Sequence, residues 1–148
     1  MFVSETYGIE DCTVYIASVS STTSYNISLP SNFKATAIVK RTSSSSSTAS
    51  LHMGIDTSNR IIAGQRTGDG TMGLLVQKNG SWVVTKGTLK NTANVDAPFE
   101  YTYQNNVSTF KYSTETLTDD TNQITPSKLI QIEKSTNGSI RDIKIKPL

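Results

Sequence analysis

Residues 32–42 read NFKATAIVKRT, and apolar side chains occupy every second position over most of this stretch. The alternating apolar residues are Phe33, Ala35, Ala37 and Val39. Successive side chains of a β-strand point to opposite faces of a sheet, so this spacing places all four on one face. The stretch therefore predicts a strand with one face against a hydrophobic core.

The same period of two recurs in residues 12–17, 25–29, 51–55, 99–104 and 142–146. Short turn sequences lie between these segments, and no segment has a convincing helical period. The strongest turn signal is Asn79-Gly80, because both residues tolerate the positive φ of a type I′ hairpin turn. The pattern predicts an all-β chain of about ten to twelve strands in two packed antiparallel sheets.

Composition narrows the function classes. The chain has 148 residues, of which 35% are hydrophobic and 18% charged, with a net charge of +2. We expect an N-terminal arm or linker over residues 1–10 and a single β-sandwich domain over residues 11–148. No run of about 18 apolar residues is present, and residues 1–10 lack the features of a secretory signal peptide, so membrane insertion is not expected. Basic residues cluster only at Lys40–Arg41, which argues against nucleic-acid binding.

Residues suited to catalysis are few. His52 is the one histidine, so any Ser–His or Cys–His dyad must use it. Its segment places Leu51, Met53 and Ile55 on the buried face and His52 on the other, where we expect a solvated side chain. Cys12 shares the face of two apolar neighbours and is expected to be a small buried hydrophobe. No predicted strand carries two carboxylates at the spacing that glycoside hydrolysis requires, so we expect no catalytic residue.

Metal sites and cofactors are not expected either. One Cys and one His cannot form a Cys/His zinc site within one chain. The densest group of oxygen ligands, residues 119–122, lacks the spacing of an EF-hand loop and is expected to be a solvated turn.

The hairpin around Asn79-Gly80 carries the most specific signal. A two-residue turn would place Gln77 opposite Trp82, Val76 opposite Val83, and Leu75 opposite Val84. Both faces of this hairpin are then apolar. Either the hairpin is covered on both sides, or one face meets a ligand or a protein partner.

Four residues are candidates for ligand binding. Trp82 lies next to a turn and is suited to stacking on the C–H face of a sugar ring, and Tyr15 lies on the polar face of its segment. Gln77 and Asp69 are candidates for hydrogen bonds to a ligand.

The order of strands and turns resembles that of a known family. Residues 32–42 are followed by ASLHMGIDTSNRIIAGQRTGDGTMGLLVQKNGSWVV at residues 49–84, and the chain closes with IRDIKIKPL at residues 140–148. This order resembles the concanavalin A-like (laminin-G-like) lectin/glucanase sandwich over most of the chain, residues 11–148. The resemblance implies a jelly-roll β-sandwich whose last strand returns beside the first. The glucanase branch carries Glu-x-Asp-x-(x-)Glu on one strand, and this sequence lacks that motif, which implies binding or architecture rather than hydrolysis.

Similar small sandwich modules occur in phage and archaeal-virus structural proteins. We therefore expect a non-enzymatic module on a virion or a cell surface that recognises a host glycan or a partner protein. The alternatives are a purely structural assembly domain without a ligand and a glycan-active hydrolase. A homo-oligomer is expected, with a trimer favoured for a fibre tip, since repetition strengthens weak single sites.

Overall fold

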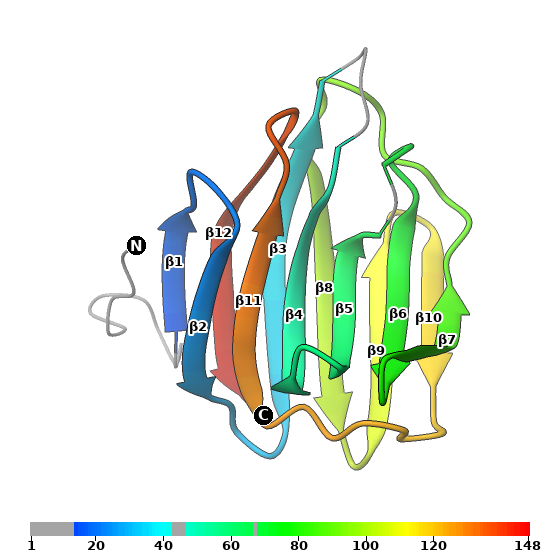
Figure 1. Cartoon of the computed structure of the whole chain (residues 1–148). Coiled ribbons are helices and arrows are strands. Elements are labelled where there is room, and N and C mark those ends of the chain that lie inside the picture. The colour runs from blue at the N-terminus through cyan, green and yellow to red at the C-terminus, as the bar shows by residue number, and fades with distance from the viewer. Residues whose placement is uncertain (1–13, 43–46, 67) are drawn as a thin grey trace.

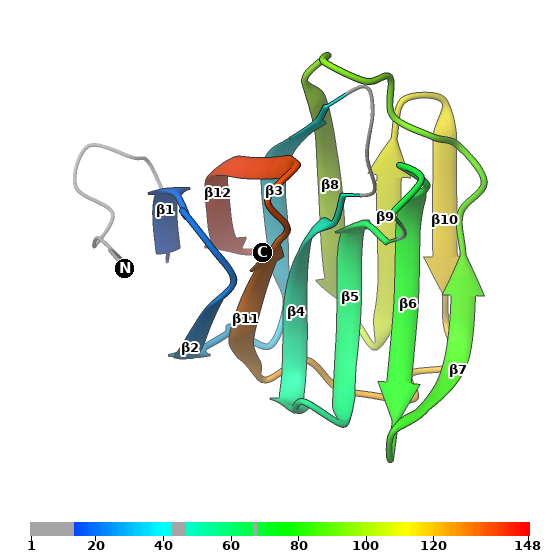
Figure 2. The same ribbon diagram turned by 45° about the horizontal axis from the view of Figure 1, so that its top comes forward.

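A computed structural model describes residues 14–42, 47–66 and 68–148, and this part of the chain contains twelve strands and no helix. The strands form two six-stranded antiparallel sheets, one in front of the other (Figure 1, Figure 2). Sheet A has the order β1 (Val14–Ser18), β12 (Gly138–Pro147), β3 (Phe33–Arg41), β8 (Ala97–Gln104), β9 (Val107–Tyr112), β10 (Glu115–Asp119). Sheet B has the order β2 (Thr23–Ser28), β11 (Lys128–Lys134), β4 (Ala49–Asp56), β5 (Asn59–Gln65), β6 (Met72–Lys78), β7 (Ser81–Lys86). The predicted all-β sandwich is confirmed, and the last strand, β12, pairs with the first, β1.

Two predictions concern residues outside the described ones. The arm predicted over residues 1–10 and the buried position predicted for Cys12 both lie there. Among the described residues, no helix is long and apolar enough to cross a bilayer.

The core lies between the sheets and follows the alternation of the sequence. The four alternating apolar residues of β3, from Phe33 to Val39, are 0–2% exposed. Rings from β8 pack on Phe33, with centroid distances of 5.8 Å to Tyr101 and 6.2 Å to Tyr103. The Tyr101 hydroxyl lies 2.7 Å from Ser108 Oγ, so the polar end of this buried ring is hydrogen-bonded.

The β6–β7 hairpin confirms the predicted turn and part of the predicted register. Asn79 and Gly80 have φ values of 50° and 80°, as a type I′ turn requires, and Gln77 pairs with Trp82. A register shift then follows, so that Val76 pairs with Val84 and Leu75 with Thr85. The predicted pairs Val76–Val83 and Leu75–Val84 are therefore wrong, because a bulge inserts one residue into β7.

Because of this bulge, the side chains of β7 do not alternate simply between the core and the outer face. Val84 packs against the core, whereas Val83 is 43% exposed and Trp82 is 53% exposed. Trp82 is thus outside the core, on the outer side of sheet B. The hairpin is not covered on both sides.

Two predictions for β4 are also wrong. His52 faces away from the buried Leu51 and Met53, as expected, but it is 2% exposed rather than solvated. Side chains from the neighbouring strands β5 and β11 cover it. Ile55 was expected in the core and is 54% exposed, because the β4–β5 register shifts between Gly54 and Asp56.

Candidate functional site

The outer face of sheet B carries a groove of about 430 Å³. Its apolar lining is Ile62 of β5 and Leu75 of β6, with the indole of Trp82 on β7. Its charged and polar lining comes from three neighbouring parts of the sheet: His52 on β4, Arg60 and Arg66 on and just after β5, and Gln131 and Glu133 on β11. The groove therefore crosses five adjacent strands and combines an aromatic ring with hydrogen-bonding side chains.

A hydrogen-bond network centred on Arg60 fixes the polar side chains. Arg60 Nε donates to Gln77 Oε1 at 2.9 Å, and Arg60 Nη1 lies 2.9 Å from His52 Nδ1. A guanidinium has no acceptor, so Nδ1 must supply the lone pair and the imidazole proton of a neutral His52 is on Nε2. That nitrogen lies 3.1 Å from Ser50 Oγ and 3.4 Å from Glu133 Oε1.

Burial and these contacts set the charge states. Burial lowers the pKa of His52 below its ordinary value of 6.5, and the positive charge of Arg60 acts in the same direction against the raising effect of Glu133. The hydrogen bond from His52 holds the pKa of the Glu133 carboxyl below its ordinary value of 4.5. At neutral pH the groove therefore holds a neutral imidazole beside an ionised carboxylate.

Ser50, His52 and Glu133 have the residue types of a hydrolase triad but not the required arrangement. In a triad, the histidine nitrogen that faces the serine accepts its proton. Here the nitrogen facing Ser50 carries the imidazole proton, and the other nitrogen is bound to Arg60. Ser50 is also 1% exposed, so a substrate carbonyl cannot reach its hydroxyl. The cluster positions the groove's side chains and has no activated nucleophile.

The described residues contain no group of three or more His, Cys, Asp or Glu side chains that could hold a metal ion. At the turn considered for calcium, Asp119 is 4% exposed, so the expected solvated turn is wrong for this residue. Its Oδ1 accepts hydrogen bonds from the amide and hydroxyl of Thr121 at 3.2 and 2.7 Å. This is a self-contained Asx turn.

The four residues predicted to bind a ligand do not form one site. Trp82 and Gln77 lie together, since they pair across β6 and β7 and Gln77 holds Arg60. Tyr15 lies on β1 at the edge of the other sheet, where its hydroxyl donates to Asp142 Oδ1 at 3.2 Å. Asp69 precedes β6, at the end of that strand remote from Trp82, and lies 3.3 Å from Lys90 Nζ.

Sequence reasoning missed five polar or charged residues of the groove: Thr48, Arg60, Arg66, Gln131 and Glu133. Glu133 lies beside His52 because β11 pairs with β4. The one usable signal was the outward position of His52. An outward histidine on a strand that is central in its sheet points to a structured outer face.

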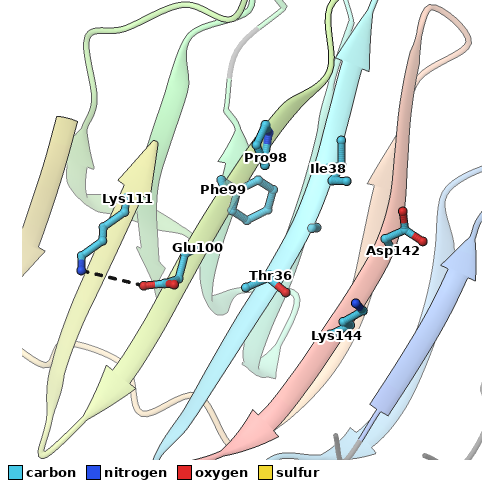
Figure 3. Close-up of a pocket in the computed structure, with 9 residues that line it drawn as sticks. Thr36, Ile38, Pro98, Phe99, Glu100, Lys111, Asp142 and Lys144 are labelled. Atoms are coloured by element: carbon cyan, nitrogen blue, oxygen red, sulfur yellow. Dashed lines mark ion pairs between the residues drawn. The ribbon is translucent and has the colours of Figure 1, made fainter. Parts of the chain in front are cut away.

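A second hollow of about 430 Å³ lies on the outer face of sheet A (Figure 3). Residues from β3, β8, β9 and β12 line it, among them Thr36, Glu100, Lys111 and Lys144. Glu100 lies between two lysines, 3.3 Å from Lys34 Nζ and 4.0 Å from Lys111 Nζ. The Glu100 carboxylate is thus neutralised by lysines of the same sheet.

Comparison with known proteins finds similarity in structure alone. Neither a known protein family nor a curated protein sequence matches the chain. Among solved structures, CG-16, a homodimeric agglutinin from chicken liver, is similar with a TM-score of 0.64 and 11% identity, covering 84% of this chain and 99% of that one. Caenorhabditis elegans galectin LEC-6 has a TM-score of 0.61 and 12% identity, covering 89% and 95%. A family 7 alginate lyase, A1-II', has a TM-score of 0.52 and 11% identity, covering 82% and 62%.

These similarities define the fold class as the jelly-roll β-sandwich that galectins have. They confirm the jelly-roll β-sandwich that the sequence predicts. Identities this low establish a shared fold, which binding proteins and an enzyme both use. The viral setting implied by the resemblance is not shown by the comparisons.

Proposed function

We propose that the chain is a non-enzymatic glycan-binding module and that the groove on sheet B holds the sugar. One observation carries the proposal: the half-exposed indole of Trp82 stands beside side chains that Arg60 fixes in place. A sugar ring has an apolar C–H face and an edge of hydroxyl groups. An exposed ring next to oriented donors and acceptors matches both parts.

Each part of the groove has a distinct task in this mechanism. Trp82 stacks on the C–H face of one sugar ring, and Ile62 and Leu75 supply apolar contact below it. Ionised Glu133 accepts hydrogen bonds from sugar hydroxyls, and Arg60 and Gln131 donate to ring and hydroxyl oxygens. Because the contacts of Arg60 with His52 and Gln77 exist before binding, less conformational entropy is lost when the sugar binds.

The similar structures support this function in kind. An agglutinin and galectins share the fold, and a toad ovary galectin with a TM-score of 0.50 and 12% identity was solved in complex with thio-digalactose. The hydrolase alternative has no such support in the groove, because Ser50 lacks a base.

The proposal includes the setting: a homo-oligomer on a virion or a cell surface. A single groove of this kind binds weakly, and repetition on one particle raises the avidity. The trimer expected for a fibre tip competes with the dimer state that the description of CG-16 names for that protein. Size-exclusion chromatography with light scattering distinguishes the two, and a monomer at micromolar concentration contradicts both.

The deciding experiment is a glycan array with the wild type, Trp82→Ala and Val83→Ala. Val83 is the matched control, since it is exposed on the same hairpin and does not line the groove. We expect Trp82→Ala to weaken binding by about tenfold or more, equal to about 1.4 kcal/mol, with an unchanged melting temperature. Val83→Ala should bind like the wild type. A wild type that binds no glycan on a broad array contradicts the proposal and favours the structural assembly domain.

A further inference from the structure

We infer that the glycan is acidic and that a carboxylate or sulfate group on it binds Arg66 at the far end of the groove from Trp82. This inference rests on the proposed function and names the class of sugar. Four observations carry it: the charge balance of the groove, the state of Arg66, the spacing along β5 and the contrast with sheet A.

The groove has an excess of positive charge. Two guanidinium groups line it, those of Arg60 and Arg66, against the single carboxylate of Glu133. His52 adds no positive charge at neutral pH, because its burial favours the neutral imidazole. One carboxylate cannot neutralise both guanidinium groups, so a net positive charge remains in the groove.

Arg66 is anchored and incompletely bonded. Its Nη2 donates to the carbonyl oxygen of Gly87 at 3.0 Å, which holds the guanidinium at the wall of the groove. Its Nε–H is buried and has no acceptor in the part of the chain that the structure describes. The side chain as a whole is only half-buried and lines the groove, so its remaining N–H groups can reach an acceptor there. A planar guanidinium binds carboxylate and sulfate oxygens well, since it offers several donors in one plane.

One carboxylate that interacts electrostatically with Arg66 is hydrogen-bonded to another residue. Glu115 interacts electrostatically with Arg66, but its Oε1 accepts from the Thr88 amide at 3.2 Å and its Oε2 from the Thr88 hydroxyl at 2.8 Å. The remaining donors of Arg66 therefore stay available to an anion that enters from the groove.

The spacing of the two arginines requires more than one sugar ring. Arg60 and Arg66 are six positions apart along an extended segment, which corresponds to about 20 Å between their Cα atoms. The outward positions between them are Ile62 and Gly64, neither of which is charged. A Cβ at Gly64 would lie 2.8 Å from the carbonyl oxygen of Ala49, so this position between the two arginines has no room for a side chain. An oligosaccharide stacked on Trp82 can run along β5 and place an acidic group at Arg66.

The outer face of sheet A lacks this excess. Its hollow pairs Glu100 with Lys34 and Lys111, and Asp142 lies 3.6 Å from Arg141 Nε. Two carboxylates, Glu100 and Asp142, balance the two lysines that line the hollow, Lys111 and Lys144, so an anion gains little there. Acidic sugars should therefore select the groove on sheet B.

The test uses an array of matched oligosaccharides that differ by one sulfate or one carboxylate, probed with the wild type, Arg66→Gln, Arg66→Lys and Lys144→Gln. Lys144→Gln is the control, because it removes the same charge from the hollow on sheet A. The wild type should prefer an acidic glycan over its neutral counterpart by about tenfold or more, and the preference should shrink between 50 and 300 mM salt. Arg66→Gln should lose the preference and keep the affinity for neutral glycans. Arg66→Lys should keep part of the preference for acidic glycans, and Lys144→Gln should keep all of it. The set of oligosaccharides that binds, sulfated or carboxylated, identifies the acidic group.

Equal binding of acidic and neutral glycans by the wild type overturns the inference, as does an unchanged preference in a folded Arg66→Gln variant. If neutral glycans bind and Trp82→Ala removes that binding, the proposed function stands while the acidic specificity falls. If no glycan binds in any arm, both fall. Melting curves verify the fold of each variant, and Arg66→Lys decides the question if Arg66→Gln does not fold.

Discussion

The outer faces of the two sheets carry hollows of the same size, about 430 Å³ each, with different chemistry. On sheet A, Glu100 forms an ion pair with Lys111 (Figure 3) and another with Lys34, and these pairs lie at the surface, where Lys34 and Glu100 are 32% and 30% exposed. On sheet B, a nearly inaccessible His52 is fixed between Arg60 and Glu133, and Trp82 stands half-exposed at the rim. The volume of a hollow therefore does not identify a binding site in this fold.

The difference is one of preorganisation. Exposed ion pairs contribute about 0–1 kcal/mol and reorient easily, because water competes for both partners. Buried hydrogen bonds hold one geometry, because a side chain that leaves them loses its partner in a place where water cannot replace it. A sheet face built in the second way can present fixed groups to a ligand.

The largest expected difference between the two faces is the effect of removing one cation from each. Arg60→Met keeps the aliphatic part of the side chain but leaves His52 Nδ1 and Gln77 Oε1 without their donor. We expect a loss of about 1–3 kcal/mol in the free energy of unfolding, measured with urea, and loss of glycan binding.

Lys111→Met on sheet A is the matched variant. Lys111 is 57% exposed in its ion pair with Glu100, so its removal should change the free energy of unfolding by less than about 0.5 kcal/mol and leave binding intact. Equal losses from Arg60→Met and Lys111→Met would show that the two faces do not differ in organisation.

The fold was largely predictable from the sequence, because local alternation decides it. The period of two in Phe33–Val39 requires no knowledge of the neighbouring strands, and Asn79-Gly80 determines its own turn. The errors at Ile55 and Val83 occur where a register irregularity breaks the period. A bulge depends on how two strands pair, and alternation along one strand does not reveal it.

The site was less predictable, because its contacts join distant parts of the chain. Trp82 and Gln77 were found together since one hairpin contains both. Glu133 and His52 are 81 positions apart and meet because β11 pairs with β4. The burial of His52 follows from that pairing, so its own strand gave no sign of it.

A change in pH should have a smaller effect on the free energy of unfolding, and this effect should come from His52 on sheet B. His52 has its pKa lowered in the folded state, so the unfolded state takes up a proton first as the pH falls. The stabilisation from neutral His52 is complete above its ordinary pKa of 6.5 and is lost as the pH falls below that value. We expect the free energy of unfolding to decrease from pH 7.5 to 5.5, with a slope of at most about 1.4 kcal/mol per pH unit for one proton.

His52→Gln should remove this slope, and Glu100→Gln on sheet A should retain it. The window is specific, since the sequence has one histidine and the pKa of Glu133 lies below its ordinary value of 4.5. A wild type with constant stability across this range would mean that His52 is not held neutral by burial.

The smallest effect is expected at Tyr15, the aromatic candidate on sheet A. Its hydroxyl is bound to Asp142 and it stands on an edge strand of the sheet opposite to the groove, so it cannot stack on a sugar held by Trp82. Tyr15→Ala should leave glycan affinity within about twofold of the wild type and cost about 1 kcal/mol or less of stability. Titration calorimetry with a glycan that binds the wild type measures the first, and urea unfolding the second. A tenfold loss of affinity in a folded Tyr15→Ala variant would move the sugar to sheet A, because Tyr15 and Arg60 lie in different sheets.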